Sequence, residues 1–198
     1  MKLGIICSSG GSTILKALSF LKSNKFKLIV VADRDCKIIA KCKKRNIFVK
    51  KIPYDKNFDN KSKIFFKTMG VDSVLLLFTR LVGPDIYKNF KTFNIHASWL
   101  PKYKGLNALV KQINKKEKFI GATLHRVNNS IDGGEFLFKL KSTYNNMNYK
   151  HISYIQKTYL CLIFMLFISK TKINLKEIDK EKFFKKINSK IIKTNIIR

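Results

Sequence analysis

The chain begins with Met1-Lys2-Leu3-Gly4-Ile5-Ile6-Cys7-Ser8-Ser9-Gly10-Gly11-Ser12-Thr13, and this stretch decides the fold. Its apolar run, Leu3–Cys7, has the length of a buried strand. The run ends in a loop of serines and glycines, after which Ile14, Leu15 and Leu18 recur at the spacing of a helix. A strand that passes through a glycine-rich turn into a helix is the first unit of an α/β fold.

The same alternation continues along the chain. Apolar strands are predicted over Lys27–Asp33, Ile47–Ile52, Asp72–Phe78 and Thr92–His96, with helices between them over Cys36–Arg45, Lys61–Met69 and Asp85–Phe90. Central strands that are apolar on both faces are typical of a parallel sheet with helices on both sides. This part of the chain is therefore predicted to be doubly wound and Rossmann-like.

Beyond Gly105 the pattern changes. Strands over Lys118–Val127 and Glu135–Lys141 are joined through Asp132-Gly133-Gly134 and are predicted to be antiparallel, with helices over Leu106–Ile113 and His151–Ile168. The sheet is then mostly parallel, but mixed, with about seven strands. The basic tail, Lys180–Arg198, is predicted to be a frayed helix or a solvated arm. Because no repeat or linker interrupts the chain, residues 1–198 are predicted to form one domain.

The composition limits the classes of function. The 198 residues are 45% hydrophobic, enough for a full core, and carry a net charge of +29 from 41 Lys+Arg and 12 Asp+Glu. Lysine is spread along nearly the whole chain, which favours attraction of small anions over a dedicated nucleic-acid surface. The four cysteines form no CxxC pair, which argues against a zinc site or a disulfide framework and for reduced thiols in the cytoplasm. The longest apolar stretch, Tyr159–Ile168, is about half of a membrane span, so we expect a soluble protein with no membrane partner.

The glycine-rich loop has two interpretations. It is either a tight turn in which Ser12 caps the helix, or a phosphate-binding loop in which Gly11 lets the backbone approach an anion. The loop lacks the glycine spacing of dinucleotide sites and the Gly-Lys-Ser/Thr of P-loops. Its place after a strand of an α/β fold favours phosphate binding.

A second group of polar residues surrounds Asn94-Ile95-His96. Asn94 and His96 alternate along a strand, so both side chains leave its same face. A carboxamide and an imidazole there can polarise a carbonyl and stabilise an oxyanion. Asp132 is either an ordinary Asp-Gly turn residue or the partner that keeps His96 charged so that it acts as an acid.

Together these residues resemble the folate-dependent formyltransferases. The resemblance extends over residues 1 to about 142 and rests on Asn94-Ile95-His96, Ser98, Leu100-Pro101, Tyr103, Gly105, Gly121-x-Thr123-x-His125 and Asp132-x-Gly134. It implies the fold predicted above and transfer of a formyl group from 10-formyltetrahydrofolate to a primary amine. It implies Asn94, His96 and Asp132 as the catalytic residues, and no metal.

The resemblance also implies binding roles. It assigns the acceptor's phosphate to Gly11, Ser12 and Thr13, and the folate to Lys61, Thr79, Arg80, Leu81, Val82 and Asn94. Within the family, the chain length and the loop favour the enzyme of purine biosynthesis that formylates glycinamide ribonucleotide. A monomer or a homodimer is expected.

Some positions depart from the family pattern. Thr13 replaces the usual Asn, Leu76-Leu77 replace Ala-Gly, Ala97 replaces Pro, and the segment Gln156–Tyr159 lacks the usual Glu. Two alternatives therefore stay open. One is an N-formyltransferase that acts on an amino-sugar nucleotide, and the other is a basic relative that binds phosphate or RNA without catalysis.

Overall fold

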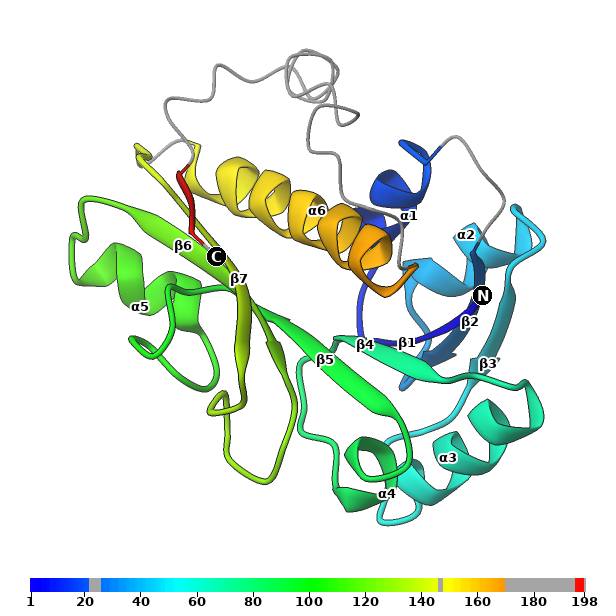
Figure 1. Cartoon of the computed structure of the whole chain (residues 1–198). Coiled ribbons are helices and arrows are strands. Elements are labelled where there is room, and N and C mark those ends of the chain that lie inside the picture. The colour runs from blue at the N-terminus through cyan, green and yellow to red at the C-terminus, as the bar shows by residue number, and fades with distance from the viewer. Residues whose placement is uncertain (22–25, 146–147, 170–194, 198) are drawn as a thin grey trace. The chain divides into compact units, whose positions relative to one another are not determined.

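The structure is a computed structural model, described here for residues 1–21, 26–145, 148–169 and 195–197 (Figure 1). The chain divides into two compact units. The first comprises Met1–Ser12, Ser23–Ile95 and His125–Glu135, and the second comprises Thr13–Lys22, His96–Leu124 and Phe136–Arg198. The single domain expected over residues 1–198 stays a prediction.

The first unit is built on parallel strands. Their order is β3-β2-β1-β4-β5, and every neighbouring pair in this series is parallel. The first strand of the sequence therefore lies centrally, with β2 on one side and β4 on the other, as in a doubly wound fold. The bounds are β1 (Lys2–Cys7), β2 (Lys27–Ala32), β3 (Phe48–Lys51), β4 (Ser73–Leu77) and β5 (Lys91–His96), of which His96 belongs to the second unit.

Helices cover both faces of these strands. In Figure 1, α2 (Lys37–Lys43) lies on one side of them, and α3 (Phe58–Thr68) and α4 (Pro84–Tyr87) lie on the other. Burial of apolar side chains holds α3 and α4 to the sheet, in a core that includes Ile6, Val31, Phe58, Phe66, Val74, Leu76 and Ile86. The strands and helices predicted for this region are confirmed.

Two helix ends differ from the prediction. Helix α3 begins at Phe58, because Asp55 Oδ1 accepts the N–H of Asn57 at 2.8 Å and turns the chain before the expected start at Lys61. Helix α4 ends at Tyr87 instead of Phe90, since Phe90 enters the core directly before β5.

The second unit contains most of β6 (Ile120–Arg126) and α1 (Ser12–Leu18), together with β7 (Phe136–Ser142), α5 (Ala108–Asn114) and α6 (Tyr149–Ile168). His125 and Arg126 of β6 and Ser12 of α1 belong to the first unit. A further strand, β8 (Asn195–Ile197), pairs antiparallel with β7, which makes the sheet mixed. The prediction of a frayed helix or solvated arm is therefore wrong for these three residues, which complete a sheet edge. The rest of the tail, up to residue 194 and at residue 198, lies outside the described residues.

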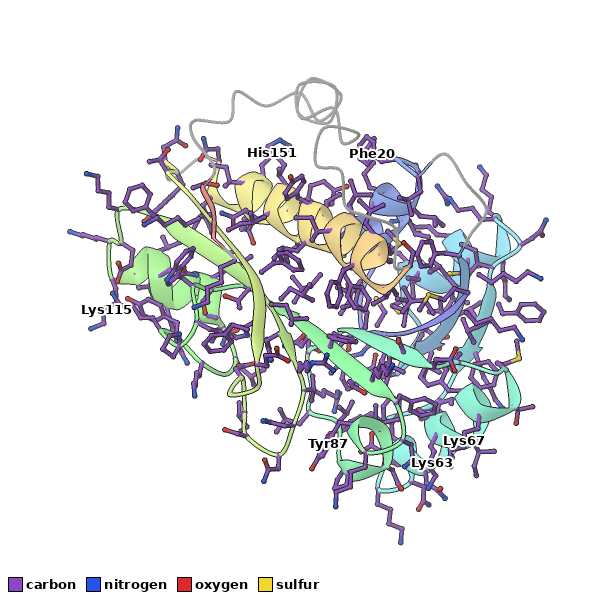
Figure 2. All side chains as sticks on the ribbon, in the orientation of Figure 1. Phe20, Lys63, Lys67, Tyr87, Lys115 and His151 are labelled. Atoms are coloured by element: carbon purple, nitrogen blue, oxygen red, sulfur yellow. The ribbon has the colours of Figure 1, made fainter. Side chains whose placement is uncertain are left out.

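Helix α6 is unusually apolar. Its length and composition match those of a membrane-spanning helix, but 61% of the relevant window is buried inside the protein. Its buried Gln156 donates from Nε2 to the Ile120 carbonyl at 3.1 Å and to Ser142 Oγ at 3.0 Å. These bonds attach α6 to β6 and β7, as in the core helix of a folded unit. Lysines such as Lys67 and Lys115 instead point outward (Figure 2).

Candidate active site

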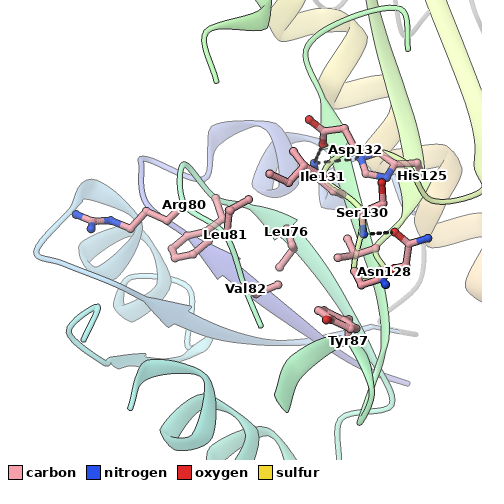
Figure 3. A pocket seen from close by; sticks show the side chains of 14 residues that line it. Leu76, Arg80, Leu81, Val82, Tyr87, His125, Asn128, Ser130, Ile131 and Asp132 are labelled. Carbon is pink, nitrogen blue, oxygen red and sulfur yellow. Dashed lines mark hydrogen bonds and ion pairs between the residues drawn. The ribbon is translucent and has the colours of Figure 1, made fainter. Parts of the chain in front are cut away.

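A cavity of about 150 Å³ opens in the first unit towards the carboxyl ends of β4 and β5 (Figure 3). In parallel sheets this is the edge at which ligands bind. Leu76 and Asn94 contribute from the two strands, and Tyr87 from α4. The remaining lining comes from His125, the segment after β4 and the loop after β6, namely Phe78, Arg80, Leu81, Val82, Val127, Asn128, Asn129, Ser130, Ile131 and Asp132.

Three polar side chains meet in the wall of this cavity. Asn94 Nδ2 lies 3.2 Å from His125 Nε2 and 3.4 Å from Asp132 Oδ1. His125 Nε2 and Asp132 Oδ1 are 3.3 Å apart, and only 3% and 10% of their side chains are exposed. Sequence reasoning predicted two of the three, Asn94 and Asp132, as catalytic residues, and the structure brings them together.

The hydrogens of this cluster follow from its partners. The Arg126 carbonyl lies 2.7 Å from His125 Nδ1 and can only accept, so Nδ1 carries a proton. In the neutral ring Nε2 then accepts from one Asn94 N–H, and the other N–H of that amide reaches Asp132. A second proton on Nε2 would instead form an ion pair with Asp132.

Asp132 comes from a tight loop that closes on the end of β6. The N–H of Arg126 donates to the Glu135 carbonyl at 2.9 Å, and a Cβ at Gly134 would lie 2.0 Å from the Arg126 carbonyl oxygen. Asp132 itself has φ of +48°, a left-handed conformation that Asp and Asn tolerate better than most residues. The turn and the functional interpretations of Asp132 are therefore compatible, because the turn carries the carboxylate to Asn94.

His96 lies two residues after Asn94 on β5 and belongs to the second unit. It is 8% exposed, and its Nε2 donates to the Tyr103 carbonyl at 2.8 Å. Because His96 and Asp132 belong to different units, their predicted pairing stays a prediction.

The segment after β4, predicted to bind folate, is fixed at several points. Arg80 Nε lies 3.3 Å from Oδ2 of Asp33, a buried carboxylate that Arg34 Nη2 also contacts at 2.5 Å. The Arg80 guanidinium also lies 4.6 Å from the Tyr54 ring centroid, and Tyr54 Oη donates to the Leu81 carbonyl at 3.1 Å. These contacts hold Arg80 and Leu81 at the cavity.

The end of this segment is tied to α3. Asp59 accepts the Gly83 N–H, and burial, followed by repulsion from Asp85, raises the pKa of the Asp59 carboxyl group. At the other end, the Thr79 N–H donates to Ser8 Oγ at 3.4 Å. Val82 is thereby held between two anchored neighbours. The predicted folate residues Arg80, Leu81, Val82 and Asn94 line one cavity, whereas Thr79 does not line it.

Lys61 lies elsewhere. Its Nζ donates to Asp55 Oδ2 at 2.8 Å on the exposed side of α3, and it is not among the residues that line the cavity. The same bond lowers the pKa of Asp55. The structure therefore offers no support for Lys61 as a folate contact. Across the described residues, no group of three or more His, Cys, Asp or Glu could hold a metal ion.

The glycine-rich loop has a packing function of its own. Gly11 has φ of +58°, and a Cβ there would lie 1.9 Å from Ile38 Cδ1 on α2. Lys41, also on α2, donates from Nζ to the Gly10 carbonyl at 3.1 Å. Ser12 begins α1, and Thr13 follows in the second unit. The absence of a side chain at Gly11 is therefore required by its packing on α2, whether or not the loop binds phosphate.

The catalytic set predicted from sequence missed His125. A polar residue at the end of an otherwise apolar strand was visible in Gly121-x-Thr123-x-His125, yet strand periodicity alone gives no reason why the imidazole should face Asn94. The bond from Nδ1 to its own neighbour's carbonyl is what turns Nε2 towards the cluster.

The chain is similar to proteins of known family. A family model described as formyl transferase matches residues 1–156 of the 198. The chain belongs to the formyl transferase family. The matched region includes every strand from β1 to β7 and the whole of the Asn94–His125–Asp132 cluster.

Two individual proteins are similar in sequence to this chain. The chain is 33% identical over 95 residues to a phosphoribosylglycinamide formyltransferase of Haemophilus influenzae, covering 43% of this chain and 45% of that one. It is 32% identical over 159 residues to the bifunctional polymyxin resistance protein ArnA of Wigglesworthia glossinidia brevipalpis, covering 72% of this chain and 23% of that protein. The match thus spans less than half of either relative.

Solved structures confirm the predicted fold. The crystal structure of phosphoribosylglycinamide formyltransferase from Anaplasma phagocytophilum matches with a TM-score of 0.77 at 21% identity, over 88% of this chain and 89% of that one. The corresponding structure from Streptococcus pneumoniae matches with a TM-score of 0.74 at 17% identity, over 84% of this chain and 98% of that one. The α/β fold with a mixed sheet is therefore that of formyl transferases.

Proposed function

We propose that this formyl transferase moves a formyl group from 10-formyltetrahydrofolate to the primary amine of glycinamide ribonucleotide. The observation that carries the proposal is the meeting of Asn94, His125 and Asp132 in a cavity that the segment Arg80–Val82 also lines. Polar groups that can bind a carbonyl oxygen and accept a proton thus stand beside the segment proposed to bind folate. No metal takes part in the proposed reaction.

The reaction needs an oxyanion donor and a proton acceptor. The amine nitrogen attacks the formyl carbon, and the carbonyl oxygen becomes an oxyanion that the Asn94 amide and protonated His96 stabilise. The amine then loses a proton, and Asp132 relays it. When the bond from carbon to folate nitrogen breaks, that nitrogen takes a proton, leaving tetrahydrofolate and a formylated amine. We include His96 beside Asn94 because the two residues are two positions apart on β5 and project from the same face of the strand.

The resting contacts fit this sequence. Both N–H groups of Asn94 are engaged, at 3.2 Å and 3.4 Å, so one must be exchanged for the substrate oxygen. Such long contacts are common in active sites before substrate binds. We assign His125 as a positioning residue, since it acts on the substrate only through Asn94 and Asp132.

The acceptor's phosphate is assigned to the backbone and hydroxyl groups of Gly11, Ser12 and Thr13. Amides at the start of a helix attract anions, and the loop follows β1 at the carboxyl edge of the parallel strands. The excess of positive charge would raise the local concentration of any phosphorylated acceptor.

A nucleotide-linked amino sugar is the second candidate acceptor. It follows from the same resemblance, which includes N-formyltransferases that act on amino-sugar nucleotides. The segment Gln156–Tyr159 lacks the Glu that the resemblance implies for contact with the ribose, so the acceptor has to be tested directly. A phosphate- or RNA-binding relative without catalysis is the third candidate.

The test is an acceptor panel. Purified protein is incubated with 10-formyltetrahydrofolate and either glycinamide ribonucleotide or an amino-sugar nucleotide, and the formylated products are separated by mass. We expect formyl glycinamide ribonucleotide, with kcat/KM at least about tenfold above that for the amino sugar. Formylation of the amino sugar alone would assign the second function, and no transfer to either acceptor would contradict catalysis.

A further inference from the structure

Three lysines and three aromatic rings of the second unit alternate in an unbroken row of contacts. Lys141 Nζ lies 5.0 Å from the Phe119 ring centroid and 5.3 Å from that of Trp99. Lys139 Nζ lies 5.3 Å from Trp99 and 4.4 Å from Phe136. Lys118 extends the row beyond Phe119 at 5.8 Å. We call this the cation–aromatic row: Lys118, Phe119, Lys141, Trp99, Lys139 and Phe136.

The row has a defined place on the second unit. Lys139 and Lys141 are two positions apart on β7, so their side chains project from the same face of that strand. Leu140 and Ser142 leave the opposite face, are buried, and meet α6 where Gln156 donates to Ser142. The row thus lies on the face of β7 that turns away from α6. All six of its residues are at least partly exposed.

The backbone fixes the central ring. A Cβ at Gly121 would lie 2.8 Å from the Trp99 backbone nitrogen, so Trp99 packs directly against β6. Lys139 Nζ also donates to the Leu100 carbonyl at 2.7 Å. The Trp99 backbone and the Lys139 ammonium are thereby held in position before any ligand arrives, which reduces the entropy lost on binding.

The positive charges of the row are not neutralised within the described residues. None of its lysines forms an ion pair with a described carboxylate. Glu117, adjacent in sequence to Lys118, is bonded to Lys102 and to the Tyr103 hydroxyl. The row therefore presents three ammonium groups without described carboxylate partners, each over at least one ring, and a base can stack on a ring once the lysine above it turns to a phosphate.

We propose that the cation–aromatic row binds single-stranded nucleic acid, independently of base sequence. Lysines alternating with aromatic rings combine phosphate attraction with platforms on which bases stack. The overall charge of +29 attracts any polyanion, but only a ligand with both phosphates and flat bases uses both kinds of group. The row belongs to the second unit and shares no residue with the Asn94–His125–Asp132 cluster of the first, and the inference does not depend on the proposed formyl transfer.

Trp99 gives a direct readout, because it is the only tryptophan of the chain. The full-length protein is titrated with oligouridylate of about 12 nucleotides, within the size range of single-strand sites, and with polyglutamate of similar charge. We expect oligouridylate to quench Trp99 fluorescence with Kd on the order of 10⁻⁶–10⁻⁴ M, and polyglutamate to leave it unchanged. Equal quenching by both would mean a surface for acidic proteins or polyanions in general, and would overturn the proposal.

Matched variants locate the surface. K118Q/K139Q/K141Q removes three charges from the row, and K67Q/K88Q/K91Q removes three charges from exposed positions of the first unit. The affinity for labelled oligouridylate, measured by fluorescence anisotropy, should decrease at least about tenfold for the row variant. The slope of log K against log salt concentration should also become shallower by about 2, because each lost phosphate contact removes roughly 0.7. The control should keep most of the affinity, and formyl transfer should not change in either. Equal weakening by both variants would assign the binding to net charge alone and would contradict a defined site.

Discussion

Asp132 Oδ1 lies 3.3 Å from Nε2 of His125, a histidine outside the catalytic trio predicted from the sequence. Asn94 Nδ2 completes the triangle with these two atoms. A carboxylate buried beside one imidazole and one amide can accept a proton without being exposed to bulk water. The geometry therefore adds His125 to the residues on which the proposed reaction depends.

Replacement of His125 by Gln should lower kcat while leaving the KM for folate nearly unchanged. The variant removes the ring that orients Asn94 and Asp132 but keeps both of these groups. We expect a loss of about tenfold, smaller than the roughly 10²–10³-fold loss that follows removal of an oxyanion donor, for which Asn94→Ala is the comparison. Unchanged kcat, or an equal rise in the KM for folate, would assign His125 to packing alone.

Replacement of Asp33 by Asn should raise the KM for the folate. The buried Asp33 carboxylate fixes Arg80, whose neighbours Leu81 and Val82 line the cavity. Without its charge, the segment is held less firmly, and we expect an increase in KM of about tenfold, or roughly 1.4 kcal/mol, with little change in the KM for the amine. Asp35→Asn is the matched control, because Asp35 pairs with Lys51 on an exposed surface. Similar kinetics for the two variants would contradict the positioning role.

Replacement of Gly11 by Ala should destabilise the protein, irrespective of any phosphate. The new methyl group would collide with Ile38 Cδ1, and the left-handed φ of +58° disfavours any side chain. Overpacking of this kind typically costs about 1–3 kcal/mol. Chemical denaturation of G11A, I38A and the double variant gives the coupling free energy between positions 11 and 38. The double variant should be at least about 1 kcal/mol more stable than the summed effects of the two single substitutions on the free energy of unfolding predict. If the two effects simply add, there is no clash between the new methyl group and Ile38.

The stability of Asp59→Asn relative to the unmodified protein should depend on pH. Burial raises the pKa of Asp59 above its ordinary value of 3.8, so the folded state binds this proton more tightly than the unfolded state. The protonated group is therefore the stabilising form, and its contribution is lost as pH rises through the folded pKa. The free energy of unfolding of Asp59→Asn minus that of the unmodified protein, measured between about pH 4 and pH 7, should increase as pH rises. A constant difference would mean that Asp59 has an ordinary pKa.

The sequence was sufficient to predict most of the fold. Periodicity located β1 to β7, because buried strands and amphipathic helices leave clear patterns of apolar residues. Strand β8 was not predicted, since Asn195–Ile197 lies in a tail whose lysines suggested solvent exposure. Its pairing with β7 is a long-range contact that no local pattern reveals.

The candidate site was predictable in part. Asn94 and Asp132 were found because scarce polar residues occur at a strand end and in a glycine turn. The position of Lys61 could not be read from the sequence, since its ion pair with Asp55 depends on where α3 begins. The contact between Asp33 and Arg80 joins the ends of two different strands and required the three-dimensional structure.

The central claim is that the carboxylate of Asp132 drives formyl transfer. Asp132→Asn is the direct test, because Asn has nearly the same shape and tolerates the left-handed backbone at φ of +48°. Transfer of labelled formyl from 10-formyltetrahydrofolate to glycinamide ribonucleotide is measured for both proteins at neutral pH, with binding of each substrate measured separately. We predict that binding persists while turnover decreases by about 10²–10³-fold. Near-normal turnover of Asp132→Asn at neutral pH would contradict the claim and leave Asp132 as a turn residue only.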